Sequence, residues 1–221
     1  MIKLLETFYM PITHIGKVAG ICYNADTEND TKNYERGLDC INSGHDRVLE
    51  YVDITLEISE YSARCIRELY TSIIGVSRLQ ESTRYVNCED FNYYIPESIK
   101  KNEIALIIYN SNMRSIKSNY SSLITLGIPK EDVANILPLG MNTKIVLKIN
   151  LRALIHMFEI RTCARAYMEY RMLMGDLFWE LCQIDPEWQY LCENVLLTKC
   201  DKVGYCTEKN SCGRWGKKDD R

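Results

Sequence analysis

Hydrogen-bonding side chains are concentrated in the stretch RLQESTRYVN, residues 78–87. It places Gln80, Glu81, Ser82 and Arg84 directly after the apolar run YTSIIGV, so it is not a plausible core segment. Arginine forks fit phosphates and the carbonyl edges of planar heterocycles. We interpret this stretch as one wall of a site for an anion or a nucleotide.

A second polar cluster crosses a predicted strand-to-helix junction, where a helix start adds backbone donors for an anion. Its members are Lys144, Asn150, Arg152, His156 and Arg161. The two clusters together would suit a nucleotide, although composition does not choose which one. Arginines four residues apart on a helix are more often a solvated face, and a lone histidine is more often a packed or surface residue than a catalytic base.

Two alternating segments, 50–59 and 142–151, predict half-buried strands. In the second, the apolar residues share one face, while Lys144, Lys148 and Asn150 share the other. The N-terminal segment, which Glu6 interrupts, predicts a first strand and a turn rather than a signal peptide.

Helical periodicity predicts three longer helices. A helix over 62–74 is capped by Ser62 and buries Cys65, Leu69 and Ile73. One long amphipathic helix covers 97–126 and is closed by Gly127, with apolar residues at Ile104, Ile108, Ile116, Tyr120 and Leu123. A further long helix runs from Arg152 to about Cys182 and stacks Arg161, Arg165 and Glu169. The pattern is α+β or α/β in a single domain over 1–221, with a cysteine-rich tail from about 190.

Composition excludes several classes of protein. The 221 residues carry a net charge of −3, so no global basic field argues for nucleic acid. No run of about 18 apolar residues is present, so we expect no membrane span. Without a signal peptide, we expect a reducing, cytoplasmic compartment in which the ten cysteines are mostly thiols.

The cysteines fall into two groups. Six are scattered, and we expect them to act as small buried hydrophobes: Cys22, Cys40, Cys65, Cys88, Cys163 and Cys182. Four cluster in the tail, at Cys192, Cys200, Cys206 and Cys212, and could surround zinc. The usual C-x2-C pairs are absent, so we favour free or adventitiously oxidised thiols and no metal.

Three segments in the same order resemble the flavin-dependent thymidylate synthases: GHDRVLEYVDITLEI, QESTRY, and the run from GIPKEDVANIL to RTCARAYMEYR. The tail GYCTEKNSCGR is similar to that of some members, so the likeness extends from about Cys22 to the end. It implies a mixed sheet with long helices and the reductive methylation of dUMP to dTMP. Methylenetetrahydrofolate would supply the carbon, NADPH would supply reducing equivalents through FAD, and the enzyme would be a homotetramer with sites built from several subunits.

The resemblance also implies roles for the two clusters. Gln80, Glu81, Ser82 and Arg84 would contact the substrate phosphate or sugar, and Lys144 lies where the family has another nucleotide-binding arginine. Arg161 matches the arginine that grips the pyrimidine and is our candidate catalytic residue. The positions that line the flavin and the substrate are matched by Asn150, Arg152 and His156.

The sequence departs from the family pattern at one place above all. Ten residues before the serine of STRY, the family has Arg-His-Arg, which holds FAD; here Ser72, Ile73 and Ile74 stand there. Each lost charge-assisted hydrogen bond costs about 1.5–3 kcal/mol, unless Arg67 or Arg78 compensates. Tyr51 and Tyr167 are smaller departures. Three functions therefore remain open: the family reaction, another pyrimidine-nucleotide modification, or non-catalytic nucleotide binding.

Overall fold

The computed structural model describes residues 1–72 and 74–218, which form two compact units. Unit 1 comprises Met1, Ile58–Thr71 and Arg78–Val146. Unit 2 comprises Ile2–Glu57, Ser72–Ser77 and Leu147–Arg221. The single-domain assignment stays a prediction.

A four-stranded sheet has the order β1-β2-β4-β3. Its strands are β1 (Ile2–Thr7), β2 (Asp53–Ser62), β3 (Val76–Gln80) and β4 (Asn142–Asn150). Hydrogen bonds from Ala63 N to Met141 O and from Leu151 N to Val52 O join opposite ends of β2 and β4. The sheet is antiparallel rather than mixed, and the predicted α+β fold with long helices is confirmed.

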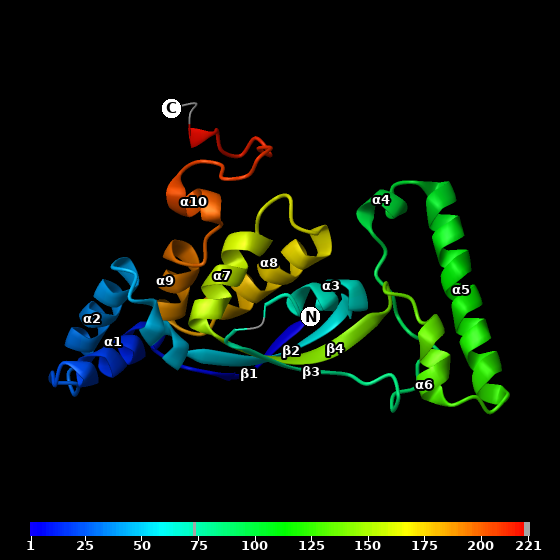
Figure 1. The fold of residues 1–221 in the computed structure, drawn as a ribbon, viewed down its shortest axis with the longest axis horizontal. Helices are drawn as coiled ribbons and strands as arrows, with labels where there is room; N and C mark the ends of the chain where they lie inside the picture. Colours follow the sequence, from blue (N-terminus) through cyan, green and yellow to red (C-terminus); the bar gives the residue numbers. More distant parts are fainter. Residues whose placement is uncertain (73, 219–221) are drawn as a thin grey trace. The chain divides into compact units, whose positions relative to one another are not determined.

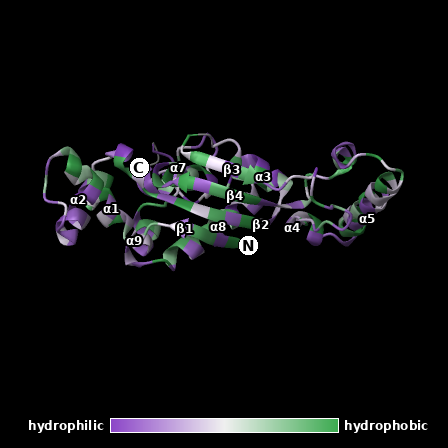
Figure 2. Ribbon diagram, turned by 90° about the horizontal axis from the view of Figure 1, so that it is seen from below, coloured by the Kyte–Doolittle hydropathy of each residue, from purple (hydrophilic) through white to green (hydrophobic). Residues whose placement is uncertain are grey.

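The predicted alternation of the strands is confirmed. The side chains of Ile54, Leu56 and Ile58 in β2, and of Ile145 and Leu147 in β4, are at most 1% exposed. Figure 2 shows hydrophobic and hydrophilic residues alternating along the strands. The strand predicted over 50–59 begins later than expected, because the short helix η1 (Asp46–Tyr51) precedes β2. The strand predicted over 142–151 ends at Asn150, because Leu151 already starts a helix.

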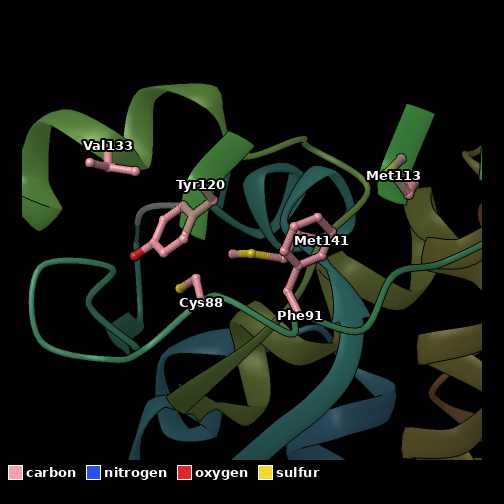
Figure 3. Packing of buried hydrophobic residues seen from close by; sticks show 6 residues of the cluster. All are labelled: Cys88, Phe91, Met113, Tyr120, Val133 and Met141. Carbon is pink, nitrogen blue, oxygen red and sulfur yellow. The ribbon is translucent and has the colours of Figure 1, made fainter. Parts of the chain in front are cut away.

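Unit 1 has a small hydrophobic core of its own. Its helices are α3 (Ala63–Leu69), α4 (Glu97–Lys100), α5 (Glu103–Thr125), α6 (Lys130–Val133) and the short η2 (Ala134–Ile136). Figure 3 shows the buried cluster, in which the loop before α4 supplies Cys88 and Phe91, α5 supplies Met113 and Tyr120, and α6 supplies Val133. This core holds the loop that follows β3, the first candidate site.

Two helix predictions in unit 1 need correction. Ser62 caps α3 as predicted, accepting from Cys65 N at 3.0 Å, but α3 ends at Leu69. The predicted core residue Ile73 lies outside the described residues. The predicted helix over 97–126 is two helices, because Asn102 caps a new one by accepting from Ala105 N at 3.0 Å.

The apolar stripe predicted for the long helix is buried only in part. Tyr120 is fully buried, whereas Ile104 is 72% and Ile108 is 57% exposed. The tyrosine packs in the unit 1 core, while the first turns of α5 present isoleucines on the surface of their unit. The periodicity therefore identified a helix but not which of its turns are covered.

The helices of unit 2 include a tightly packed pair, α1 and α2, shown side by side in Figure 1. A β-carbon on Gly16 would lie 1.7 Å from Asn33 O, and one on Gly37 would lie 2.0 Å from Ile12 O. Only glycine permits this backbone contact. The helices of the unit are α1 (Pro11–Cys22), α2 (Asp30–Asn42), α7 (Leu151–Arg161), α8 (Met168–Cys182), α9 (Pro186–Asn194) and α10 (Lys199–Val203).

The predicted helix from Arg152 to Cys182 is also two helices. The Thr162 hydroxyl donates to Phe158 O at 2.6 Å, and a turn follows in which Ala166 N donates to Cys163 O. Arg165 lies in this turn, and Glu169, on α8, is 1% exposed. The predicted stack of Arg161, Arg165 and Glu169 on one helix was therefore wrong.

The cysteines depart from their predicted burial at three positions: Cys22 is exposed, and Cys163 and Cys182 are half-buried. Cys22 is the last residue of α1, where the chain leaves the packed pair. In the tail, Cys192 and Cys206 are buried. Among the described residues, no helix has the length and hydropathy needed to cross a membrane.

Candidate functional site

The polar stretch after β3 begins on a fixed backbone. β3 ends at Gln80, and Glu81 N donates to Lys144 O at 2.8 Å, which places Glu81 beside Lys144 of β4. Tyr70 donates its hydroxyl to Gln80 Oε1 at 3.2 Å, and Gln80 Nε2 lies 3.4 Å from Thr143 Oγ1. The Gln80 amide is therefore oriented from both ends.

A tight turn follows and presents Ser82 and Arg84. Ser82 O accepts from Tyr85 N and Val86 N at 3.1 Å, and Arg84 N lies 3.4 Å from Ser82 Oγ. Arg84 Nε lies 3.0 Å from Glu131 Oε2, in a pair that is more than half exposed. Exposed pairs contribute about 0–1 kcal/mol, so an anionic ligand can take Arg84 from Glu131 at little cost.

Arg78, at the start of the same stretch, has a different role. Its guanidinium stacks over the Tyr70 ring at 4.7 Å, and Nη1 donates to Leu69 O at 2.9 Å. These contacts hold β3 against the end of α3. Unit 1 thus brings the predicted substrate residues together in one corner, which consists of Gln80, Glu81, Ser82, Arg84 and Lys144.

Unit 2 gathers the three residues predicted to bind the cofactor. Asn150 caps α7 by accepting from Ala153 N at 2.9 Å, and Arg152 and His156 follow on the first turns. All three line a cavity of about 500 Å³, which we call the α7 cavity. Because α7 starts here, its N-terminal dipole adds to the positive charge of Arg152.

Each basic group of the α7 cavity faces a carboxylate. Arg152 Nη1 lies 2.6 Å from Glu50 Oε1. Glu159 serves two partners, because Lys202 Nζ lies 2.9 Å from Oε1 and His156 Nδ1 lies 3.6 Å from Oε2. These pairs hold the basic groups at the cavity lining, and the side chains of all three pairs remain partly exposed to solvent.

Ile74 also lines the α7 cavity and is 88% exposed. Because α3 ends at Leu69, Ile74 does not belong to the predicted helix over 62–74 and is not a core residue. Gly75 follows with φ +73°, and a β-carbon there would lie 2.5 Å from Asn150 Nδ2, so glycine lets this turn approach the cap of α7. Ile74 is an exposed apolar group at the mouth of a polar cavity.

Arg152 lines a second cavity, of about 530 Å³, together with His45, Arg47 and Tyr51. These three come from the GHDRVLEY segment. The two cavities share Asp46 and Arg152, so they lie on either side of the same side chains. Apolar lining from Leu49 and Ile155, next to amide, guanidinium and imidazole donors, fits a planar heterocycle with polar edges and an attached phosphate.

Arg161 belongs to neither of these cavities. It is the last residue of α7, its guanidinium lies 5.0 Å from the centre of the Tyr170 ring, and it lines a third cavity of about 380 Å³. Arg165 and the C-terminal segment complete this lining. The structure thus assigns Arg161 to unit 2, whereas the other predicted substrate residues belong to unit 1.

The C-terminal segment is held at the third cavity. Arg165 Nη1 donates to Asn210 O at 2.9 Å. Cys200 and Cys206 interact through their thiols; burial raises the pKa of Cys200, and a backbone hydrogen bond from Glu208 lowers the pKa of Cys206. No cluster of three or more potential metal ligands is found in residues 1–72 and 74–218.

Sequence reasoning missed Glu50, Glu159 and Lys202 as members of the α7 cavity. Glu50 lies in a segment that the resemblance had marked, so its spacing before β2 was an available signal. Lys202 carries no such signal, since its approach to Glu159 depends on how α10 folds back next to α7 (Figure 1).

Comparison with known proteins identifies the family. The family model "Thymidylate synthase complementing protein" matches residues 3–187. The flavin-dependent thymidylate synthase of Pyrococcus furiosus is 30% identical over 203 residues, covering 90% of this chain and 82% of the relative. That of Nitratidesulfovibrio vulgaris is 33% identical over 186 residues, covering 79% and 74%. A crystal structure of the Helicobacter pylori flavin-dependent thymidylate synthase complexed with FAD and dUMP superposes with a TM-score of 0.69 at 20% identity, covering 88% of this chain and 98% of that one.

The fold is that of an α+β protein with a polar cluster in each of its two units. The chain belongs to the family of the flavin-dependent thymidylate synthases, which are methyltransferase enzymes. The match to the family model ends at Glu187, so α10 and the cysteine-rich tail lie beyond it.

Proposed function

We propose that this protein converts dUMP to dTMP by reductive methylation, with methylenetetrahydrofolate as the carbon donor and NADPH as the reductant. The observation that carries the proposal is the α7 cavity, in which Asn150, Arg152 and His156 meet. These are the residues that match the family's flavin-lining positions, and their donors fit a flavin nucleotide. We further propose a reducing compartment such as the cytoplasm, in which the ten cysteines remain thiols.

The corner of unit 1 is proposed to bind the phosphate and sugar of dUMP. Arg84 supplies a fork for the phosphate, and Ser82 supplies a hydroxyl beside it. Lys144, on the neighbouring strand, adds a second charge. The Gln80 amide, held by Tyr70 and Thr143, offers directed hydrogen bonds to the sugar or the base edge.

Arg161 is proposed to grip the pyrimidine. Its planar guanidinium donates to the carbonyl oxygens of uracil with a fork geometry that a lysine lacks, and it stabilises the negative charge that develops on these oxygens during the reaction. The Tyr170 ring supports the flat face of this guanidinium. No cysteine needs to add to the ring, because reduced FAD, when bound, supplies the hydride.

Asn150, Arg152 and His156 are proposed to hold FAD. Arg152 would exchange its exposed partner Glu50 for a flavin phosphate or carbonyl, while Asn150 keeps the start of α7 in place. Apolar residues at the cavity lining exclude water from the ring. In this role the protein positions the reactants and contributes no group of its own to the redox step.

We further propose a homotetramer in which several subunits complete each site. The exposed isoleucines Ile104, Ile107 and Ile108 on α5 form an apolar surface of unit 1 that a subunit contact would cover. Arg161 and the unit 1 corner could then meet on different subunits.

Ile74 favours a second candidate function. The resemblance aligns Ile74, which lines the α7 cavity, with a family arginine that holds FAD, and an apolar side chain there would suit a relative with altered or lost flavin chemistry. The alternatives to the family reaction are therefore a different modification of a pyrimidine nucleotide and nucleotide binding without catalysis.

The test of the proposal is the cofactor and ligand content of the purified protein. We expect a yellow protein whose released cofactor has the mass of FAD, and saturable binding of dUMP in titration calorimetry. Binding of dUMP without any flavin, even after incubation with FAD, would favour the non-catalytic relative and contradict the proposal.

Restoring a cation at position 74 should strengthen FAD binding. We expect Ile74→Arg to raise FAD affinity about tenfold, or about 1.4 kcal/mol, since a new charge-assisted hydrogen bond contributes 1.5–3 kcal/mol before its entropy cost. The gain should fall with added salt. Because Ile74 is exposed, the melting temperature should stay unchanged.

The control for this substitution is Ser77→Arg, which adds the same charge at an exposed position of β3 that does not line the α7 cavity. Flavin fluorescence titration measures both variants. An Ile74→Arg protein that is stable but no tighter for FAD would exclude a weakened flavin site at this position.

A further inference from the structure

We propose that Lys202, on α10, is an anion-binding residue of the α7 cavity and contacts the phosphates of the flavin nucleotide. This assignment rests on the proposed function and adds to it a residue beyond the segment that matches the family model. Lys202 supplies the cavity with positive charge that Ile74 cannot supply.

The position of Lys202 follows from direct contacts. Its ammonium lies 2.9 Å from Glu159 Oε1, and its side chain lines the same cavity as Asn150, Arg152 and His156. The side chains of Lys202 and Glu159 are only 28% and 27% exposed. The charge is therefore held at the cavity lining and not extended into solvent.

The helix that carries Lys202 is anchored by other residues. Thr198 caps α10 by accepting from Asp201 N at 3.1 Å. Asp201 in turn accepts from Trp215 Nε1 and Arg214 Nη2, each at 2.9 Å. Because none of these bonds involves Lys202, removing its ammonium should leave α10 in place.

The chemistry of the group indicates a phosphate ligand. Lysine is a compact point charge with three rotatable donors, which suits a phosphate more than the flat edge of a heterocycle. The apolar lining of the cavity, from Leu49, Ile74 and Ile155, suits the aromatic ring instead. We therefore expect the phosphates of the flavin nucleotide to lie at Lys202 and its ring system to lie against the apolar residues.

Glu159 makes this assignment testable in two directions. It pairs with Lys202 and also lies 3.6 Å from His156 Nδ1, so in the ligand-free protein it competes for the positive charge that a phosphate needs. If Lys202 binds phosphate, removal of Lys202 should weaken flavin nucleotide binding, and neutralisation of Glu159 should strengthen it. If the pair only fixes α10 to α7, both changes should weaken the protein in the same way.

The experiment is fluorescence titration of the full-length protein with FAD and with riboflavin, which lacks phosphates. We expect Lys202→Ala to weaken FAD binding at least tenfold and leave riboflavin affinity unchanged, and Glu159→Gln to strengthen FAD binding. Lys199→Ala, on the same helix but lining the third cavity, is the matched control and should leave FAD affinity unchanged. In the Lys202→Ala background, Ile74→Arg should restore most of the lost affinity.

Three outcomes would overturn the assignment: unchanged FAD affinity in Lys202→Ala, equal losses for FAD and riboflavin, or equal drops in melting temperature and FAD affinity for Lys202→Ala and Glu159→Gln. Wild-type protein that binds neither flavin would instead overturn the proposed function, and the assignment of Lys202 with it.

Discussion

Arg161→Ala is expected to weaken dUMP binding by about 2–4 kcal/mol, the cost of losing a desolvated charged contact. The loss should be large because a guanidinium makes several directed bonds to the carbonyl oxygens of uracil. The fold should remain intact, although the lost cation–π contact with the buried Tyr170 ring costs about 2 kcal/mol for a desolvated pair. Titration calorimetry with dUMP and a thermal melt measure the two effects separately.

Two controls separate a binding role from a structural one. Arg161→Lys keeps the charge but not the fork, and we expect it to lose most of the affinity. Arg165→Ala removes the bond to Asn210 and thus loosens the C-terminal segment while leaving Arg161 in place. Unchanged dUMP affinity in Arg161→Ala would remove Arg161 from the site.

Gly37→Ala is expected to lower the free energy of unfolding by about 3 kcal/mol or more. A β-carbon at this position would lie 2.0 Å from Ile12 O, a backbone atom of α1 that cannot move without separating the helix pair. Chemical denaturation followed by circular dichroism gives the loss directly.

Gly175→Ala on α8 is the matched control, because nothing lies within 4 Å of its β-carbon. There the same substitution should stabilise the protein by about 0.5–1 kcal/mol, since alanine has a higher helix propensity than glycine. Similar stability changes in the two variants would contradict the close packing of α1 against α2.

The sequence predicted the strands well because their signal is local. In β2 from Ile54 to Ile58, and in β4 from Ile145 to Ile149, every second residue is apolar, because burial of one face of a sheet requires that period. The sequence also placed Ser62 as a helix cap, since a serine side chain needs only the backbone three residues ahead.

Helix ends were predicted poorly, because short-range competitors decide them. Asn102 starts a new helix inside a continuous apolar period, and the Thr162 hydroxyl bonds to Phe158 O where α7 stops. The exposure of Ile104 and Ile108 depends on what covers α5, which the pattern of the helix itself does not record.

In the candidate site, too, residues with a local sequence signal were predicted, and residues that depend on the fold were not. Gln80, Glu81, Ser82 and Arg84 were found because they are contiguous and hydrogen-bonding, and Asn150, Arg152 and His156 because a family pattern spans a single strand and helix. Lys202 reaches the α7 cavity only through the fold, 43 residues after its partner Glu159. Ile74 could be identified as a departure, but its exposure at the cavity required the structure.

The measurement that tests the central claim most directly is product analysis of a reaction with dUMP, methylenetetrahydrofolate, NADPH and FAD. We predict dTMP, identified by mass and carrying the isotope-labelled methylene carbon, formed in proportion to NADPH oxidised, and much reduced formation with Arg161→Ala. A protein that binds FAD and dUMP yet releases no dTMP, or releases another modified pyrimidine nucleotide, would contradict it.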